Sequence, residues 1–292
     1  MFLDTTMPRT VDAAFSAYVA SLTPTSSERQ AAILHRATIE SALRNELSVE
    51  VVRETGSFSH GTGLRGRSDV DLIVALNYQR PMNPSTALRW VRDALESRFP
   101  RTAIRTSSPT VVVPFASGNE LFEVAPGFVT ASHPHTRYEI PRPAGGWMET
   151  SPGAHLRYVT EVNQSPLGGV KSLARLLKAW KYENRVPVNS FYLEMAAAEH
   201  MDGEPYFDAL SDLQAMFQKL NSRQFSAIQD PTGQTGLIHA TSSLAGIFGA
   251  IGAAQKADVY AQRAFAARAR GDELTAFGFL HRIFGRSFPA YS

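Results

Sequence analysis

The sequence predicts an α+β protein in which a mixed β-sheet lobe, entered through helices, is followed by a helical lobe. Three observations support this class. Apolar residues recur at helical spacing over the first 46 residues, residues 49–124 contain short β-prone runs, and the chain after residue 153 again has mainly helical patterns. The 292 residues suffice for one large domain or two intimate lobes. With 43% hydrophobic residues, a packed core is expected and wholesale disorder is not.

Two helices are predicted at the start of the chain. The first has apolar residues three and four positions apart, at Val11, Ala14, Phe15, Tyr18, Val19 and Leu22. The second begins at a capping-box pair, Thr25 and Glu28, and its apolar face is predicted to run through Ile33, Ala37 and Leu43. Both helices are therefore expected to present one apolar side to the rest of the protein.

The sheet is predicted from five β-prone runs, at residues 49–53, 70–76, 103–106, 110–115 and 121–124. Ser117, Gly118 and Asn119 separate the last two runs and are typical of a hairpin turn. One helix interrupts the strands. It begins at Pro84 and Ser85 and has Leu88, Val91, Leu95 and Phe99 along one side.

The boundary between the lobes is predicted in the Pro- and Gly-rich segment 130–153, which favours loop and crossover structure. Residues 1–150 would form the first lobe with its N-terminal helices, and residues 151–292 the helical lobe. Helices are expected at 154–163, 168–184, 189–201, 205–220 and 237–270, with an irregular stretch at 225–236.

Composition excludes several classes of function. The sequence contains no cysteine, so disulfides, Cys-ligated metals and thiol nucleophiles are excluded. Lys and Arg total 29 against 27 Asp and Glu, and a net charge of +2 is weak support for binding a long nucleic acid. The first ten residues lack a signal-peptide pattern, and the longest apolar stretch, 244–254, is shorter than the ~20 residues that span a bilayer. We expect a cytoplasmic protein that does not enter a membrane.

The sharpest local motif is Asp69-Val70-Asp71 at the head of the apolar run that ends at Leu76. On a strand, residues i and i+2 point to the same face, so the two carboxylates would lie side by side. Such carboxylates repel each other unless a cation lies between them, and Mg²⁺ prefers carboxylate and phosphate oxygens. A solvated strand edge is the alternative interpretation of this common spacing.

Gly56-Ser57, twelve residues before Asp69, favours the metal interpretation. Glycine lets backbone N–H groups approach a phosphate closely, and a serine hydroxyl can donate to it. A third carboxylate is expected from a neighbouring strand, and Glu123 is in the right position, although a lone strand Glu often faces solvent. The sequence thus predicts a site for a triphosphate and metal ions.

Other motifs are weaker. Gly61 to Gly66 fits G-x-G-x-x-G, but a strand follows it where a dinucleotide-binding site requires a helix, and no Walker A triplet occurs. A zinc site at His133 and His135 lacks a third ligand. His60 is expected at the surface, with phosphate contact as its alternative, and Arg65 and Arg67 could face either phosphate or solvent.

Taken together, Gly56-Ser57, Asp69-Val70-Asp71 and Glu123 followed by Pro126 resemble the nucleotidyltransferase superfamily of polymerase-beta type. The runs 173–181 and 186–194 are similar to the helical lobe of the bacterial CD-NTases, relatives of cyclic GMP-AMP synthase and oligoadenylate synthetase. Trp147, Ser151-Pro152, His155 and the run 228–233 also resemble that family, and the likeness covers about residues 10–270.

The resemblance implies a two-lobed nucleotidyltransferase fold whose helical lobe completes the nucleotide-binding cleft. It implies a reaction in which a ribose hydroxyl of one NTP attacks the α-phosphate of another, giving a cyclic di- or trinucleotide second messenger in antiphage signalling. By position, Asp69, Asp71 and Glu123 would bind two Mg²⁺ or Mn²⁺ ions. Gly56, Ser57, Lys178 and Ser190 would hold the triphosphate, and Phe191 would stack on a base, although Lys178 could be a solvated lysine and Phe191 a core aromatic.

One residue departs from the family pattern, because Glu123 stands where the family usually has Asp. The extra methylene alters the reach of the carboxylate, and since Mg²⁺ tolerates little distortion, a preference for Mn²⁺ becomes plausible. Two alternatives to the cyclic oligonucleotide synthase stay open: a template-independent RNA, tRNA or small-molecule nucleotidyltransferase, and a catalytically weak nucleotide-binding scaffold. Beyond NTPs, an activating or effector protein encoded elsewhere is the only partner expected.

Overall fold

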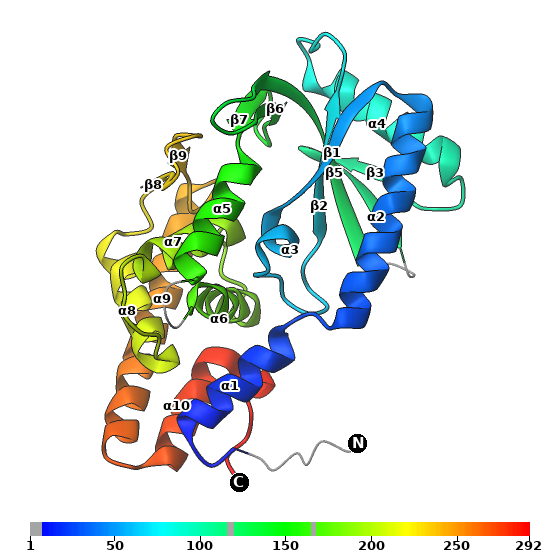
Figure 1. Cartoon of the computed structure of the whole chain (residues 1–292). Helices are drawn as coiled ribbons and strands as arrows, with labels where there is room; N and C mark the ends of the chain where they lie inside the picture. The colour runs from blue at the N-terminus through cyan, green and yellow to red at the C-terminus, as the bar shows by residue number, and fades with distance from the viewer. Residues whose placement is uncertain (1–7, 116–119, 165–167) are drawn as a thin grey trace. The chain divides into compact units, whose positions relative to one another are not determined.

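The computed structural model describes residues 8–115, 120–164 and 168–292, and the chain forms two compact units (Figure 1). The sheet unit comprises Pro24–Tyr158 and the short stretch Thr232–Thr235. The helical unit comprises the chain up to Thr23, Val159–Pro231 and Gly236–Ser292. The predicted α+β class is confirmed, whereas the turn predicted at residues 117–119 lies outside the described residues.

The sheet unit is built on one mixed β-sheet. Its central strand order is β1-β2-β5-β4-β3. Strand β6 pairs with the second half of β5 on one side and with β7 on the other. Only β2 and β5 pair in parallel, and every other neighbouring pair among the described strands is antiparallel. The strands are β1 (Val49–Thr55), β2 (Val70–Leu76), β3 (Arg105–Ser107), β4 (Thr110–Phe115), β5 (Glu120–Ala131), β6 (Arg137–Pro141) and β7 (Trp147–Thr150).

The two faces of this sheet bury different residues. Helices α2 (Ser26–Glu46) and α4 (Pro84–Arg98) pack on the face that carries Val70, Leu72 and Val74 (Figure 1). The opposite face has a smaller apolar cluster around Ile73 and Tyr138. Since side chains alternate along a strand, Asp71 lies on this second face, which α2 and α4 leave uncovered.

The start of α2 follows the sequence prediction, but its buried face does not. Thr25 and Glu28 form the predicted capping box, with the Glu28 backbone N–H donating to the Thr25 hydroxyl over 3.2 Å. The predicted face through Ile33 and Ala37 is wrong, because Ile33 is 50% exposed and Ala37 is also exposed. The residues that pack on the sheet are Ala32, Ile39, Ala42 and Leu43. Apolar residues occur on more than one side of this helix, and contact with the sheet selects among them.

The segment 130–153 was predicted to be loop and crossover, and this is wrong for most of its length. It contains the end of β5 and the strands β6 and β7. The Trp147 indole N–H donates to the backbone oxygen of Pro81 over 3.0 Å, and its ring packs edge-on against Phe128. These long-range contacts, which local composition does not encode, hold the segment in the sheet.

The helical unit confirms the predicted helical character of the second half of the chain. Three differences occur. Helix α8 begins four residues later than predicted, and α9 begins seven residues later, after the short paired strands β8 (Ile228–Gln229) and β9 (Leu237–Ile238). A last helix, α10, was not predicted. The helices are α1 (Val11–Leu22), the part of α5 (Pro152–Asn163) from Val159 onward, α6 (Val170–Glu183), α7 (Ser190–Met201), α8 (Ala209–Ser222), α9 (Leu244–Ala269) and α10 (Glu273–Phe284), followed by a 3₁₀ turn, Gly285–Ser287.

Helix α1 belongs to the helical unit, which differs from the predicted first lobe of residues 1–150. Its Phe15 and Tyr18 rings pack edge-on against Phe284 and Phe288, near the other end of the chain. This aromatic cluster is the reason that α1 joins the second unit rather than the sheet. The boundary predicted at residue 150 lies close to the observed change of unit at Val159, within α5.

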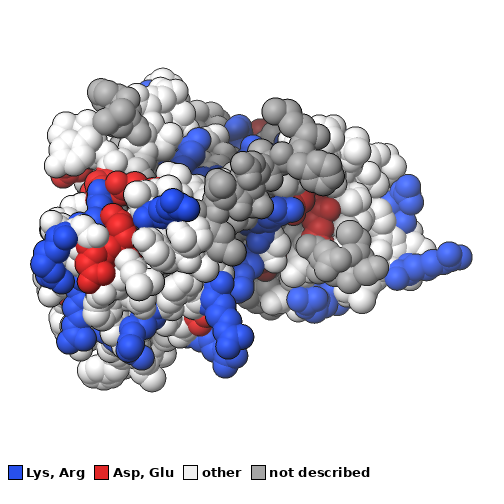
Figure 2. All heavy atoms as spheres, turned by 90° about the horizontal axis from the view of Figure 1, so that it is seen from below, with Lys and Arg blue, Asp and Glu red and all other residues white. Residues whose placement is uncertain are grey.

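The surface carries charges of both signs. On the face drawn in Figure 2, described Lys and Arg side chains lie singly or in small groups, with acidic side chains beside several of them. This scatter agrees with the near-balanced composition. Among the described helices, none is long and apolar enough to cross a membrane.

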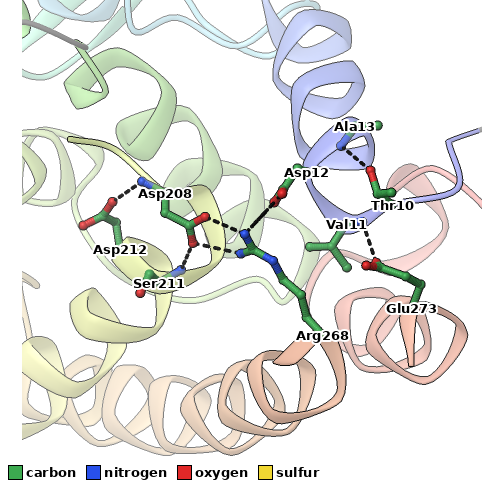
Figure 3. A network of polar contacts seen from close by, with 9 residues as sticks. All are labelled: Thr10, Val11, Asp12, Ala13, Asp208, Ser211, Asp212, Arg268 and Glu273. Carbon is green, nitrogen blue, oxygen red and sulfur yellow. Dashed lines mark hydrogen bonds and ion pairs between the residues drawn. The ribbon is translucent and has the colours of Figure 1, made fainter. Parts of the chain in front are cut away.

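Arg268 of α9 connects three helices of the helical unit (Figure 3). Its guanidinium donates to both carboxylate oxygens of Asp208, over 3.0 and 2.9 Å, and also pairs with Asp12 of α1. Asp208 caps α8 by accepting from the Ser211 backbone N–H. Bidentate pairs of this kind are the stronger class of ion pair.

We expect Arg268→Met to lower the free energy of unfolding by about 1–2 kcal/mol, because Asp208 and Asp12 lose their common partner. Chemical denaturation followed by circular dichroism measures the change. The matched control is Arg263→Met on the same helix, since Arg263 makes no ion pair with any residue that the structure describes. Equal destabilisation by both substitutions would contradict a role for the network.

Candidate active site

The parallel pairing of β2 with β5 sets the geometry of the acidic residues. Asp71 lies directly opposite Glu123 in the register of these strands, so both side chains project from the same face. Asp69 precedes the first residue of β2, and its charge acts on Glu123. Thr110 of β4 lies near the Glu123 carboxylate and acts to lower its pKa. The structure therefore places Asp71 and Glu123 on the sheet face opposite α2 and α4, with Asp69 near enough for its charge to act on Glu123.

Burial makes this cluster electrostatically unfavourable in its charged form. Burial raises the pKa of Asp69, an effect that Arg105 opposes. Burial also raises the pKa of Glu123, the neighbouring charge of Asp69 raises it further, and Thr110 and Arg105 act in the opposite sense. Because burial destabilises the charged form of these carboxylates, a nearby cation would stabilise that form.

These donors fit a hard divalent cation, because all three are carboxylates and two are adjacent in the strand register. The side chains do not, as they lie, converge into a preformed metal cluster of three ligands in the described part of the chain. Binding a cation would therefore involve side-chain rotation toward it.

The Gly56-Ser57 turn lies against the same carboxylates. Gly56 opens α3 (Gly56–His60) with φ +62°, a conformation that L side chains rarely adopt. A Cβ at this position would overlap the Asp71 carboxylate and lie 2.8 Å from its Cγ. The turn is closed by the Thr62 backbone N–H, which donates to the Ser57 backbone oxygen over 2.9 Å. Gly56 is thus required both for the backbone conformation and for the close approach to Asp71.

We expect Gly56→Ala to lower activity by about 100-fold, because the added methyl displaces the Asp71 carboxylate and misplacement of about 1 Å can cost that much. The φ angle alone costs about 1–2 kcal/mol of stability. Gly233→Ala is the matched control, since Gly233 has φ +67° and nothing within 4 Å of its added Cβ. Product formation rates and thermal unfolding of both variants separate displacement from strain. If the two variants are equally active, the close approach of Gly56 to Asp71 does not matter for activity.

Lys178 is not the solvated lysine that one interpretation of the sequence allowed. Its side chain is 2% exposed and its Nζ lies 2.7 Å from Glu194 Oε2, itself 2% exposed. This buried pair connects α6 to α7. For Lys178 to bind the triphosphate as predicted, a phosphate oxygen would have to reach an ammonium that is buried and paired with Glu194.

Lys181, which sequence reasoning gave no role, contacts a predicted site residue. Its Nζ donates to the Ser190 hydroxyl over 2.6 Å. Burial, and then the charge of Lys178, lowers the pKa of Lys181. The signal for this residue was its position three residues after Lys178, which places both on neighbouring parts of one helix face. Lys181 and Ser190 therefore form a pair of an ammonium and a hydroxyl, next on α6 to the Lys178–Glu194 ion pair.

Phe191 and His60 are at least partly buried, whereas Arg65 and Arg67 are exposed. Phe191 is half-buried in the first turn of α7 and lies outside the set of buried core residues of that helix. The expectation that His60 lies at the surface is wrong, since it is 2% exposed. Arg65 pairs with Glu28 over 3.3 Å, and Arg67 is exposed.

Comparison with known families and sequences gives concordant matches. A family model described as "Second Messenger Oligonucleotide or Dinucleotide Synthetase domain" matches residues 9–163, more than half of the chain. A probable cyclic nucleotide synthase of Bacillus cereus is 22% identical over 62% of this chain and 65% of its own length. A cyclic AMP-AMP-AMP synthase of Acinetobacter sp. is 27% identical over 56% of this chain and 51% of its own. The chain thus spans less than two thirds of the length of these relatives.

Solved structures resemble the chain over nearly its whole length. CdnC of E. coli with ATP has a TM-score of 0.77 at 19% identity, covering 95% of this chain and 98% of CdnC. The CD-NTase CdnG of Bradyrhizobium diazoefficiens in complex with GTP has a TM-score of 0.78 at 13% identity, covering 97% of each chain. At these identities the likeness establishes the fold.

Proposed function

Since the chain belongs to the family of second messenger oligonucleotide or dinucleotide synthetases, we propose that it is a metal-dependent nucleotidyltransferase that makes a cyclic oligonucleotide. The carrying observation is the approach of the Gly56 turn to Asp71, which faces Glu123 across the β2–β5 pair. A phosphate-binding turn in contact with a carboxylate cluster suits a triphosphate and its divalent cations.

In this proposal Asp69, Asp71 and Glu123 hold two Mg²⁺ or Mn²⁺ ions. The ions supply charge neutralisation at the triphosphate and activation of the attacking ribose hydroxyl. The family uses divalent metals generally, while the identity and number of the ions are part of the proposal. Gly56 lets the turn approach the phosphates, and the Ser57 hydroxyl donates to them. The chain's contribution is to fix the reacting triphosphate beside the carboxylates.

The proposal also assigns roles to residues of the helical unit, from the family resemblance and from their contacts within that unit. Ser190 and Lys181 present a hydroxyl and an ammonium that are already paired, and both are suited to phosphate oxygens. Lys178 adds a further positive charge whose partner is Glu194. Phe191 is half-buried in the first turn of α7, and the proposal assigns its ring to stacking on a base.

The products are proposed to be cyclic di- or trinucleotides that act in antiphage signalling. Related proteins are named cyclic AMP-AMP-AMP synthases, and one solved relative is a complex of CdnC with a HORMA protein. By analogy, a protein partner encoded elsewhere activates this chain or reads its product. A long nucleic acid is not proposed as a substrate, because the charge of the chain is near balance.

The test is incubation of the purified protein with the four labelled NTPs and Mg²⁺ or Mn²⁺, followed by phosphatase treatment and chromatography. We expect a phosphatase-resistant product, and omission of one NTP at a time identifies its bases. If all products are linear, the proposed cyclisation is wrong and the activity is polymerisation or nucleotidyl transfer. The assay is repeated with lysate from infected cells as a source of activator. If no product forms with either metal under both conditions, the proposed enzymatic activity is wrong.

One observation favours a second candidate, a catalytically weak nucleotide-binding scaffold. Glu123 has one methylene more than the Asp usual in the family, and it lies in direct register with Asp71. We expect the wild type to be active and Glu123→Asp to change its Mg²⁺-to-Mn²⁺ activity ratio, because the carboxylate reaches less far. Turnover measured with each metal checks this. Inactivity of both forms, with nucleotide binding retained in calorimetry, would support the scaffold.

A further inference from the structure

One row of side chains crosses the sheet at the level of the acidic residues. Residues that lie opposite one another on paired strands project from the same face of a sheet. The registers of β1, β2, β5, β4 and β3 connect five such residues, in the order Thr55, Asp71, Glu123, Val112 and Arg105. The row therefore begins next to the turn that opens α3, passes through two of the carboxylates and ends at an arginine.

The other face of the sheet supports this placement of Arg105. Val111 and Val113, the neighbours of Val112 on β4, belong to the core formed with α2 and α4. Since side chains alternate along a strand, Val112 and its partner Arg105 lie on the face of the carboxylates. Arg105 is exposed and lies two strands from Glu123, which is about 9–10 Å. A guanidinium on a long apolar stem can extend over Val112 toward Glu123 while its charge stays in water.

The Arg105 guanidinium keeps its N–H donors for a ligand. Its side chain makes no hydrogen bond or ion pair with any residue that the structure describes. Its charge acts on both Asp69 and Glu123, where it opposes the rise in pKa that burial causes. An exposed arginine without a partner is often a solvated surface residue, and its place in the row beside the carboxylates is what distinguishes Arg105.

The order of the row separates the two nucleotides of the proposed function, on which this inference rests. In that reaction the acceptor hydroxyl oxygen bonds to the donor α-phosphorus, its proton passes to solvent, and pyrophosphate leaves. The attacking and leaving oxygens of such a displacement lie roughly in line. With the leaving phosphates at the turn of Gly56 and Ser57, the hydroxyl arrives from the opposite side, where the row continues to Arg105.

We propose that Arg105 binds a phosphate of the acceptor nucleotide and so positions the attacking hydroxyl beside Glu123. A guanidinium matches two phosphate oxygens at once, which fixes orientation as well as charge. The acceptor has such a phosphate both as a free NTP and as the end of a linear intermediate. The alternative is that Arg105 acts only on the charge of the carboxylates, in which case the phosphate of the acceptor is irrelevant to its effect.

A single transfer in which each nucleotide has one role distinguishes these readings. The donor is an α-labelled 2′,3′-dideoxynucleoside triphosphate, which has no hydroxyl to attack with. The acceptor is a 5′-monophosphate or the matching nucleoside, and neither has a pyrophosphate to lose. We expect Arg105→Met to raise the KM for the monophosphate by about tenfold and to leave the KM for the donor and for the nucleoside unchanged. Arg105→Lys, which keeps the charge without the bidentate geometry, should give an intermediate KM.

Arg101→Met is the matched control, because Arg101 is an exposed arginine of the same unit that lies outside the row. It should behave as the wild type. If Arg105→Met slows transfer to the nucleoside as much as transfer to the monophosphate, Arg105 acts on the carboxylates and the proposal is wrong. An unchanged KM for the monophosphate, or a raised KM for the donor, would overturn it equally.

A binding measurement separates this inference from the proposed function. Equilibrium dialysis gives the affinity for labelled monophosphates with Mg²⁺ and a saturating α,β-methylene NTP, which fills the donor site without reacting. We expect Arg105→Met to weaken binding about tenfold and Arg101→Met to leave it unchanged, with both variants folded by thermal unfolding. Equal affinity in all three proteins, or no binding by the wild type, overturns the site. A chain that shows the expected difference in affinity yet makes no product would refute the synthase activity and retain Arg105 as a phosphate-binding residue.

Discussion

The Asp69→Asn/Asp71→Asn double variant is expected to form no phosphatase-resistant product while remaining fully folded. Two of the three carboxylates of the active site lose their charge, and we expect turnover to fall by at least about three orders of magnitude because the cations lose their ligands. The change is measured by the NTP assay on wild type and variant prepared side by side.

The thermal unfolding temperature of the double variant should equal or exceed that of the wild type. Burial raises the pKa of Asp69, which means that the folded protein disfavours the charged carboxylate above that pKa. The neutral amide removes this penalty at neutral pH. A folded variant that still makes product would refute the site, and a variant that unfolds would assign these residues a structural role instead.

The second large effect is expected at Lys178. Lys178→Met should lower the free energy of unfolding by about 3–5 kcal/mol, because it leaves the Glu194 carboxylate buried without its ammonium partner. Urea denaturation measures this loss. Lys181→Met is the matched control on the same helix, where the lost partner is the Ser190 hydroxyl rather than a buried charge.

Removing both charges separates the structural role of Lys178 from its proposed role at the triphosphate. Lys178→Met/Glu194→Met should regain most of the lost stability, because an apolar pair of similar volume often replaces a buried ion pair without cost. If Lys178 also binds phosphate, the stable double variant will still show a raised KM for NTP. Wild-type KM in that variant would restrict Lys178 to the ion pair.

Much of the fold was predictable where the signal is local. The strands β2 and β4 have the bounds that the sequence predicted, because each apolar run is flanked by residues that favour turns. The capping box of Thr25 and Glu28 was also predictable, since it depends on residues three apart in one turn. Strands β6 and β7 were missed because they are held by pairing with β5 and by the contacts of Trp147.

For the candidate site as well, some features were predictable from the sequence and others depend on the tertiary structure. The sequence by itself determined which residue types are present: two carboxylates at the head of a strand, a third on a later strand, and a Gly-Ser turn before them. The tertiary structure decided that Asp71 faces Glu123, that Gly56 contacts Asp71 and that Lys178 is buried against Glu194.

The family, the fold class and the order of the acidic residues thus came from the sequence, whereas the strand register and the burial of Lys178 did not. The physical reason is the distance along the chain between the groups concerned. Asp71 and Glu123 meet because β2 pairs in parallel with a strand about fifty residues later, and such long-range pairing is fixed by packing of the whole unit rather than by local preference.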